Sequence, residues 1–336
     1  MSKTAMRIAL LEVSHWHFPL YQQALHRQDV EIVAVSDRDA ACRERIAADF
    51  GAPAFADWRD ALRREGIDFA FAFGRHREMP AIAEALIGLG IPFAMEKPCG
   101  TKAEDVARLR ALAETRGLYV AVPLILRLSP LLTTLRQAED GEATRYTHLA
   151  FRFIAGPPER YLQNSPWMLD PAVSGGGSTI NLAVHFIDLV RQLTGNDARA
   201  VFGLMNNFSY GTDVEDYSQV SMRMADGTPV LIETGYAFPM TETEKREFSI
   251  TIGTSRGYFR TTDAGLTEYS RATGESVTHP IELDTDGLYA DFVGRALDDW
   301  RAGAAPIAGL ADVEAVMRVV DAAYASNAEG RSLDLA

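Results

Sequence analysis

The chain has 336 residues, of which 47% are hydrophobic, and its formal net charge is -13. This length favours two domains, and the negative charge argues against binding to nucleic acid or to an anionic membrane surface. No apolar run reaches the roughly 20 residues of a membrane helix, and no cleavable leader precedes the first predicted strand. With only Cys42 and Cys99, neither a disulfide framework nor a cysteine metal site is expected. We therefore expect a cytoplasmic protein whose partner is a small molecule.

The first third of the chain alternates short apolar runs with stretches of helical spacing. This alternation predicts an α/β fold with a doubly wound parallel sheet. The predicted strands lie at residues 7–13, 30–37, 68–74, 92–97 and 119–126. A capping box of Thr101 and Glu104 predicts a helix that ends at Gly117, and Ser129 followed by Pro130 predicts the start of another.

The rest of the chain changes to segments of alternating hydrophobicity. These segments lie at residues 146–153, 217–224 and 230–238, and a turn at Asp226 and Gly227 joins the last two. They predict an antiparallel or mixed sheet. The change of pattern places a domain boundary near Arg127, with residues 1–126 in one domain and 127–336 in the other.

The turn after the first strand, "ALLEVSHWHFPLY", carries Glu12, Ser14 and His17 where a phosphate-binding turn would have glycines. Glycines there allow backbone N–H groups to approach a pyrophosphate closely. The helix that follows keeps Pro19 in its first turn, so its dipole still offers partial positive charge. Because the Ser14 hydroxyl and the imidazoles of His15 and His17 can donate hydrogen bonds, we favour a rebuilt phosphate site over a lost one, with Trp16 near the nicotinamide or the strand ends.

The second strand ends at Asp37, 20 residues beyond His17. A carboxylate at this distance typically accepts hydrogen bonds from an adenosine ribose diol and repels a 2′-phosphate, which favours NAD over NADP. Arg38 weakens that inference, since a guanidinium could stack on adenine or bind the phosphate. An N-cap role for Asp37 in the following helix is an equal alternative.

Two further motifs combine residue types that packing alone does not explain. In "MEKPCG", Lys97 stands at a buried strand end, where an amine could polarise a carbonyl or exchange a proton with a substrate hydroxyl. In "SGGGSTINLAVHFIDLVRQLTG", Asn181, His185 and Asp188 are spaced to share one helix face. His185 could take a hydroxyl proton, with Asp188 fixing its tautomer. A solvated Lys97 and a core His185 are the alternatives.

These motifs, in this order, resemble the Gfo/Idh/MocA family of oxidoreductases. The Glu96 to Pro98 tripeptide, "LILRLSP", the glycine-run helix and the closing phrase "DAAYAS" all resemble family segments. The resemblance implies a dinucleotide-binding Rossmann domain at 1–126. It also implies a substrate-binding and oligomerisation α/β domain at 127–336, with a large, open and mostly antiparallel sheet. The implied activity is hydride transfer between NAD, or alternatively NADP, and a hydroxyl of a sugar, cyclitol or related polyol, in a homodimer or homotetramer.

The resemblance also implies roles for individual residues. Lys97 matches the catalytic lysine, His185 the catalytic histidine, Glu96 a residue beside the nicotinamide ribose, and Arg127 a residue that can reach the substrate. Asn181 stands where the family usually has aspartate, so it can hold a substrate hydroxyl but cannot act as a base.

The loop after the third strand also departs from the family pattern. It places Gly74, Arg75 and His76 along the cofactor edge, where Arg75 could neutralise part of the pyrophosphate. In residues 153–170 we expect Tyr161, Asn164 and Trp167 to form part of the sugar pocket, because aromatic faces suit a pyranose.

Three alternatives stay open at this point. His15 and His17 could hold Zn²⁺, as in metal-dependent hydrolases, but this would need further ligands and a barrel, whereas the rest of the chain offers Lys97 instead, and we predict no metal site. The changed turn and Asn181 also suit a non-catalytic sensor of a sugar or dinucleotide. A glycosidase that uses tightly held NAD is the third.

Overall fold

A computed structural model describes residues 5–138, 145–162 and 165–335. Its first sheet has six parallel strands in the order β3-β2-β1-β4-β5-β6. This confirms the predicted doubly wound sheet. The order reverses between β1 and β4, and ligands of such sheets bind at the carboxyl ends of the strands at this switch point. The strands are β1 Met6–Leu11, β2 Val30–Ser36, β3 Ala54–Phe55, β4 Phe69–Ala72, β5 Phe93–Met95 and β6 Val120–Ala121.

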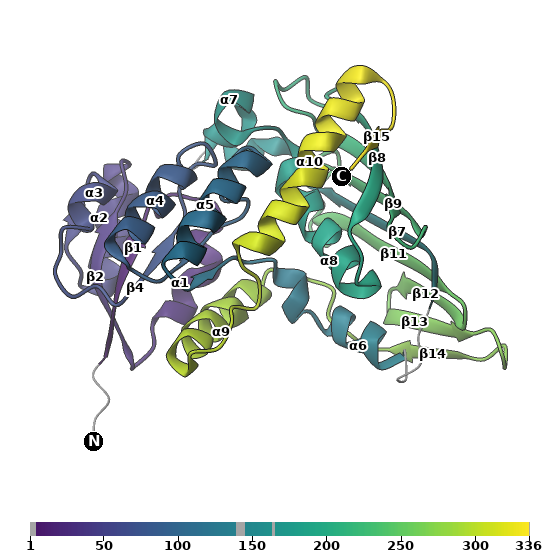
Figure 1. Cartoon of the computed structure of the whole chain (residues 1–336), viewed down its shortest axis with the longest axis horizontal. Helices are drawn as coiled ribbons and strands as arrows, with labels where there is room; N and C mark the ends of the chain where they lie inside the picture. The colour runs from purple at the N-terminus through teal and green to yellow at the C-terminus, as the bar shows by residue number, and fades with distance from the viewer. Residues whose placement is uncertain (1–4, 139–144, 163–164, 336) are drawn as a thin grey trace.

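Helices cover both faces of the first sheet (Figure 1). Those within the first third of the chain are α1 Phe18–Leu25, α2 Ala40–Phe50, α3 Trp58–Ala61, α4 Met79–Leu89 and α5 Ala103–Thr115. One more, α9 Leu288–Ala302, comes from the far end of the sequence and packs on α1. Its Phe292 and Val293 are fully buried in the same apolar cluster as Ile8 and Leu10 of β1. The C-terminal part of the chain therefore completes the core of the first sheet.

The predicted capping box at Thr101 and Glu104 is wrong. Helix α5 begins at Ala103 after Lys102, and no side chain of its own N-terminal turn caps it. The Ala103 N–H instead donates to Asp321 Oδ2, at 2.8 Å. Asp321 belongs to α10 (Leu310–Glu329), so a helix far away in sequence supplies this cap.

The second sheet has nine strands in the order β14-β13-β12-β11-β7-β10-β9-β8-β15. It is mixed, since β7 and β10 are parallel and the other pairs are antiparallel. The predicted turn at Asp226 and Gly227 does join β9 to β10. The strands are β7 Tyr146–Ala155, β8 Ala198–Asn206, β9 Tyr217–Met224, β10 Pro229–Gly235, β11 Arg246–Thr254, β12 Gly257–Thr262, β13 Gly265–Ser270, β14 Ser276–His279 and β15 Leu333–Asp334.

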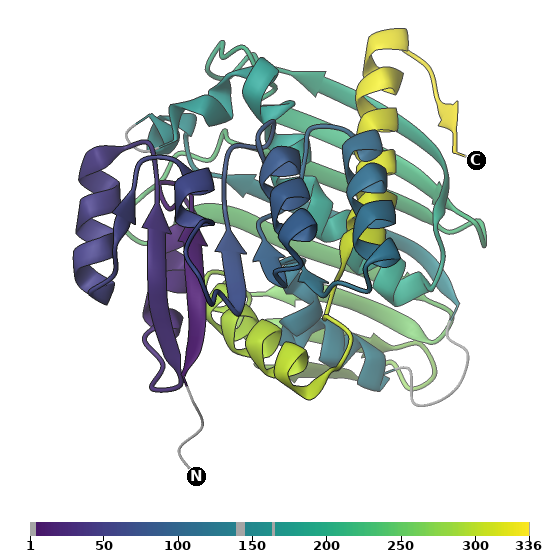
Figure 2. The same cartoon turned by 60° about the vertical axis from the view of Figure 1, so that its left-hand side comes forward.

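Helix α10 lies between the two sheets and packs on α5 from the first and on β8 from the second (Figures 1 and 2). Shorter helical segments connect the sheets and carry much of the candidate site. They are η1 Ile125–Leu128, α6 Pro130–Ala138, η2 Pro158–Tyr161, η3 Pro166–Leu169, α7 Pro171–Ser174, η4 Thr179–Ala183 and α8 Val184–Thr194. The start of α6 at Pro130 is as predicted. The domain boundary between residues 126 and 127 falls inside η1 and stays a prediction.

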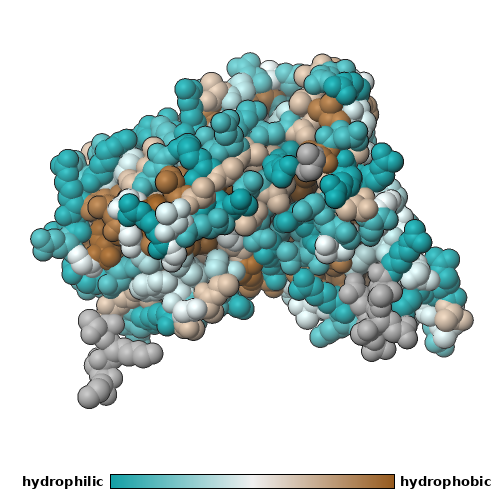
Figure 3. Space-filling model, viewed as in Figure 1, coloured by the Kyte–Doolittle hydropathy of each residue, from teal (hydrophilic) through white to brown (hydrophobic). Residues whose placement is uncertain are grey.

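Hydrophilic residues predominate on the face shown in Figure 3, in keeping with the charge of the chain. Within the three described ranges, no helix combines the length and the apolar character that crossing a bilayer requires.

Candidate active site

The turn after β1 is held by the end of β2. The Ser14 N–H donates to Asp37 Oδ2 at 2.6 Å, and the Asp39 N–H donates to Asp37 Oδ1 at 2.7 Å. Asp37 has no exposed surface. Each oxygen accepts one backbone hydrogen bond and a carboxylate can accept more, so the contact with a ribose diol stays a prediction. The helix N-cap is Asp39, whose side chain accepts the Cys42 N–H, so the N-cap alternative for Asp37 is wrong.

Glu12 occupies the first of the expected glycine positions with φ at +59°, a left-handed conformation that glycine adopts more easily. Only 5% of its surface is exposed. Burial, followed by the negative charge of Asp37, raises the pKa of Glu12 to about 7. The Arg38 guanidinium pairs with two carboxylates, Glu12 at 3.4 Å and Glu78, and its contact with adenine or a phosphate stays a prediction.

His15 and His17 point inward from the same turn. His17 Nδ1 lies 3.0 Å from Glu96 Oε1, and the Tyr21 hydroxyl donates to the same oxygen at 2.5 Å. Tyr289, on α9, contacts His17 Nε2 at 3.1 Å. Burial lowers the pKa of both histidines well below the usual value, and the positive charge of Lys97 lowers them further. Both rings are therefore neutral at ordinary pH, and the contact of His17 with Glu96 is a hydrogen bond.

Lys97 follows Glu96 at the end of β5, and only 1% of its surface is exposed. Its Nζ donates to the backbone O and to Oδ1 of Asn181, at 2.7 and 2.6 Å. Burial lowers the pKa of Lys97 to about 8, against the opposing effect of the Glu96 carboxylate. The alternative of a solvated lysine is excluded, and this amine can exchange a proton near neutral pH.

Asn181 lies in η4, a single π-helical turn ahead of α8. Such turns often mark functional sites. Its amide Nδ2 donates to the hydroxyls of Tyr161 and Tyr236, at 2.9 and 3.1 Å. With Oδ1 taken by Lys97, the amide orients the lysine, and the tyrosines orient the amide.

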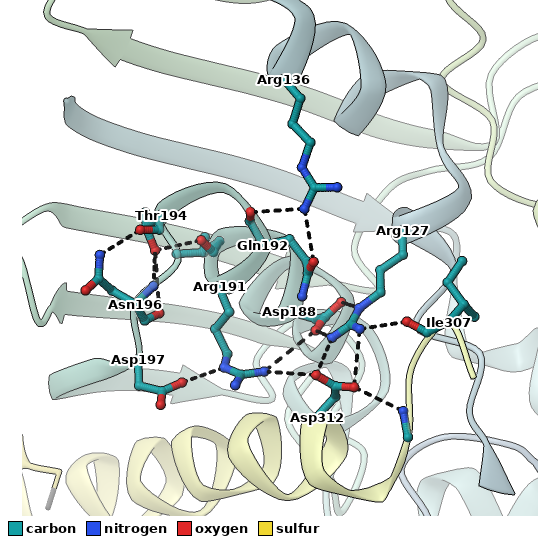
Figure 4. Close-up of polar contacts among 12 residues, drawn as sticks. Arg127, Arg136, Asp188, Arg191, Gln192, Thr194, Asn196, Asp197, Ile307 and Asp312 are labelled. Atoms are coloured by element: carbon teal, nitrogen blue, oxygen red, sulfur yellow. Dashed lines mark hydrogen bonds and ion pairs between the residues drawn. The ribbon is translucent and has the colours of Figure 1, made fainter. Parts of the chain in front are cut away.

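His185 and Asp188 do not form the predicted pair. Asp188 is fully buried and accepts hydrogen bonds from Arg127 Nε and Nη2, at 2.8 and 2.6 Å (Figure 4). Burial raises the pKa of Asp188, and Arg127 opposes this rise. His185 Nδ1 has no hydrogen-bond partner among the described residues. Burial and the charge of Lys97 lower the pKa of His185 well below its usual value.

The implied contact of Arg127 with substrate is likewise not supported. Besides Asp188, its guanidinium contacts Asp312 and donates to the Ile307 carbonyl at 2.7 Å (Figure 4). Its side chain is 10% exposed. These bonds tie η1, α8 and the start of α10 together, which is a structural role.

A cavity of about 270 Å³ opens in front of Lys97, and we call it the central cavity. Lys97, Asn181 and His185 all line it. Its other polar or charged lining residues are Trp16, His17, Arg160, Lys245, Arg246, Thr285, Asp286 and Tyr289. The buried Trp16 Nε1 and His185 Nδ1 atoms lack protein partners in the described part of the chain. These two orphaned groups and the amine suit a polar ligand with several oxygens.

A second cavity, of about 440 Å³, lies outside the turn and reaches the starts of α1 and α2. We call it the outer cavity. Ser14, His15 and Trp16 line it, together with Arg45 and Arg160. Trp16 and Arg160 border both cavities.

The remaining predicted residues lie around these cavities without lining the central one. Tyr161 is 1% exposed and supports Asn181. Trp167 lines neither cavity, because its indole packs against His15 and His76 at ring-centroid distances of 5.7 and 5.0 Å. Neither lines the central cavity, although Tyr161 lines the outer one, so their part in a sugar pocket stays a prediction; Asn164 lies outside the described residues.

The three residues predicted along the cofactor edge, in the loop after β4, differ in their surroundings. His76 is buried and bonded to the Ser174 carbonyl, and its pKa falls to about 3, chiefly through burial. It is therefore a packing residue. Gly74 has φ at +71° and is also buried. Arg75 is half-buried, and no carboxylate contacts it in the described ranges, so it is available to an anion.

Several lining residues had no signal in the sequence. Tyr289 and Asp286 come from the start of α9, and Lys245 and Arg246 from the start of β11. Arg160 contacts the ring of Tyr161, with its Cζ 4.7 Å from the ring centroid. Their positions depend on packing between segments that are far apart in the sequence, which a local sequence pattern does not predict.

Two family models match the chain. Residues 16–124 match the oxidoreductase family with an NAD-binding Rossmann fold, and residues 133–260 match the GFO/IDH/MocA C-terminal domain. Together these matches span more than half of the 336 residues.

Curated relatives match over part of their length. The rhizopine catabolism protein MocA of Rhizobium meliloti is 26% identical over 62% of this chain and 65% of its own. The UDP-N-acetylglucosamine 3-dehydrogenase of Acidithiobacillus ferrooxidans is 29% identical over 59% of this chain and 57% of its own. The chain thus spans less than two thirds of these relatives in the matched region.

Solved structures match along nearly the whole chain. GenD2 from gentamicin A biosynthesis, solved with NAD, has a TM-score of 0.85 at 21% identity and covers 99% of this chain and 97% of its own. Levoglucosan dehydrogenase, in complex with NADH and levoglucosan, has a TM-score of 0.84 at 16% identity and covers 98% of this chain and 99% of its own. At such identities these likenesses show the fold.

Proposed function

Since the chain belongs to the GFO/IDH/MocA oxidoreductase family, we propose that it is an NAD-dependent dehydrogenase acting on a CH–OH group of a sugar, cyclitol or related polyol. The observation that carries this proposal is the bond of the buried Lys97 amine to Asn181 at the wall of the central cavity. The names of relatives support it, because dehydrogenases of nucleotide sugars and dihydrodiols are among them.

The residues at the reacting end fit a nicotinamide and a polyol. The orphaned Trp16 Nε1 and His185 Nδ1 atoms border the central cavity beside Lys97. The part of the site that would bind the pyrophosphate differs from a glycine-rich turn, because the Ser14 N–H already donates its hydrogen bond to Asp37. There the binding groups would be the Ser14 hydroxyl, Arg75, which contacts no carboxylate among the described residues, and the N-terminus of α1.

The chain's own residues supply the proton chemistry. When bound, NAD supplies the acceptor for the hydride that leaves the substrate carbon. The Lys97 amine takes the hydroxyl proton during oxidation and returns it during reduction, which its pKa of about 8 permits near neutral pH. His185 is neutral and can hold the same or a neighbouring hydroxyl. Asn181 is a positioning residue because it acts through Lys97.

The test combines the purified protein with NAD and a panel of sugars, cyclitols and sugar acids, while NADH absorbance is followed. Turnover of at least one polyol is expected. Failure of every panel member, together with no binding of NAD or NADH by isothermal titration calorimetry, would overturn the proposal.

A sensor with the same fold is the second candidate. The turn after β1 favours this candidate for two reasons. Glu12 adds a buried carboxylate, which would repel a pyrophosphate, and Asp37 accepts the hydrogen bond of the Ser14 N–H, which a pyrophosphate would otherwise receive. A sensor would bind a sugar or dinucleotide without turnover, so the same two measurements separate the candidates. A glycosidase using tightly held NAD would release a sugar without net NADH formation.

The proposal includes a homodimer or homotetramer in the cytoplasm. Its support is the second sheet, because α8 and α10 lie on one face and no described helix covers the other (Figure 1). An open sheet face of this kind suits association between copies. Light scattering coupled to size exclusion tests this, and a monomer at micromolar concentration would contradict it.

A further inference from the structure

Three buried side chains with metal-ligating atoms meet beside the central cavity. One ligand atom from each of His15, His17 and Glu96 lies within 4.8 Å of the others. The three residues are 3%, 2% and 2% exposed. The sequence offered no third ligand for the two histidines, because Glu96 is 79 residues from His17 along the chain.

The spacing is close to that of atoms bound to one ion. Metal bonds of about 2.0–2.1 Å in a tetrahedral site place neighbouring ligand atoms about 3.3 Å apart. His17 Nδ1 and Glu96 Oε1 are already 3.0 Å apart. The widest separation, up to 4.8 Å, has to close by about 1.5 Å at most when an ion binds.

Two of the groups have no cationic partner in the described ranges. His15 Nε2 is buried without a hydrogen-bond partner there, whereas its Nδ1 accepts the His17 N–H at 3.2 Å, so an ion bound through Nε2 requires the other tautomer. Glu96 accepts hydrogen bonds from His17, from Tyr21 and from the Lys97 N–H, but it contacts neither an ammonium nor a guanidinium among the described residues. A buried carboxylate without a cation is costly, and a divalent ion would offset that cost.

The surroundings resemble the outer contacts that orient metal ligands. The Tyr21 hydroxyl donates to Glu96 Oε1 at 2.5 Å, and the Tyr289 hydroxyl contacts His17 Nε2 at 3.1 Å. When an ion takes the place of the proton between His17 and Glu96, that proton moves to Nε2. The Tyr289 hydroxyl can then accept a hydrogen bond from His17 Nε2, to which it had donated before, because a hydroxyl can both donate and accept.

We propose that His15, His17 and Glu96 bind one divalent transition-metal ion, and that Zn²⁺ is the ion this set of two imidazoles and a carboxylate suits. His17 also lines the central cavity. An oxygen entering from that cavity therefore completes the coordination. This makes Glu96 a metal ligand in place of the ribose contact implied by the family resemblance, and the site does not depend on the proposed dehydrogenase activity.

The experiment measures metal in an untagged, full-length protein. After incubation with Zn²⁺ and removal of free metal, elemental analysis should find about one equivalent per chain. Replacement by Co²⁺ should give the visible absorption bands of a four-coordinate ion. His15→Ala and Glu96→Gln should each lose the bound metal and those bands.

Two further variants make the test specific. His76→Gln removes another buried imidazole near His15 that is not in the cluster, so its metal content should equal that of the natural protein. Tyr289→Phe removes only an outer contact and should weaken Zn²⁺ binding by about 10- to 100-fold. The proposal is overturned if the natural protein binds no Zn²⁺ under these conditions, or if Tyr289→Phe and His15→Ala bind it as tightly as His76→Gln does. Either failure leaves the assay for polyol oxidation unaffected.

Discussion

Asn181 accepts hydrogen bonds from the Lys97 ammonium through both its backbone O and its side-chain Oδ1, at 2.7 and 2.6 Å. The amine therefore has a fixed position although no carboxylate among the described residues is bonded to it. Burial lowers the pKa of Lys97 to about 8, the charge of Glu96 opposes this effect, and the neutral Asn181 adds no charge to oppose it further. Asn181 thus replaces the usual aspartate without removing the amine that exchanges the proton.

Lys97→Met should lower kcat for the natural polyol by about 10²- to 10⁴-fold, because the general acid-base group is lost. The melting temperature should change little, since methionine fills a similar buried volume and removes a charge that is costly to bury. Lys102→Met is the matched control, because the Lys102 side chain is 59% exposed and its ion pair is with Asp321, away from the central cavity. A Lys97→Met enzyme with the kcat of that control would remove Lys97 from the mechanism.

Arg127→Met should destabilise the protein by about 3–5 kcal/mol, because Asp188 and Asp312 would lose their shared guanidinium. The KM of the folded enzyme should stay unchanged, since Arg127 does not line the central cavity. Arg136→Met serves as control, because this exposed arginine bonds to the neutral Gln192 and not to a carboxylate among the described residues (Figure 4). Chemical denaturation and steady-state kinetics measure the two effects. A raised KM without loss of stability would restore the implied substrate contact.

Asp37→Ala should weaken NAD and NADP to the same extent. The substitution leaves the N–H groups of Ser14 and Asp39 without their acceptor, and an unsatisfied buried group costs about 1–3 kcal/mol. The turn would loosen, which affects both dinucleotides. Titration calorimetry with both dinucleotides gives the ratio of affinities. Asp57→Ala, which removes the cap of α3, is the control. A ratio that shifts toward NADP would show that the carboxylate meets the ribose after all.

The sequence was informative about the fold wherever the determinant was local. Alternating apolar runs located the strands of the first sheet, and Ser129 with Pro130 located the start of α6. Helix α5 was misjudged at its start because its cap, Asp321, comes from α10. The return of α9 to the first sheet was also missed, since its amphipathic pattern does not say which surface it covers.

The same distinction explains the site. The sequence singled out Lys97, Asn181 and His185 because a buried lysine and a polar row on an apolar helix are unusual within a few residues, and the structure brings all three to one cavity. It did not indicate the ion pair of Arg127 with Asp188, because these residues are far apart along the chain and meet only in the fold. The grouping of His15, His17 and Glu96 was equally inaccessible, since two separate strand ends bring them together.

Glu12→Gln should stabilise the protein at alkaline pH and have little effect at pH below the ordinary glutamate pKa. The pKa of Glu12 is about 7 in the folded chain and 4.5 in the reference state. Between these values the unfolded chain has released its proton while the folded chain still binds one, so stability falls as pH rises. At pH values above about 7, Glu12 is ionised in the folded chain, and burying its charge lowers the free energy of unfolding by an amount on the order of 3 kcal/mol.

The difference in stability between the natural protein and Glu12→Gln should depend on pH, and this dependence shows that ionisation of the Glu12 carboxylate is the cause. Glutamine keeps the side-chain length and the same strained φ, so only the ionisation is removed. Glu78→Gln is the control, because it removes the other carboxylate that pairs with Arg38. Thermal unfolding of the three proteins across the pH range should show the Glu12→Gln curve separating from the natural one between pH of about 4.5 and 7. The same variant should also bind NAD more tightly at alkaline pH, because a negative charge next to the turn is gone. A constant difference at all pH values would mean that packing or strain, and not burial of a charge, governs this position.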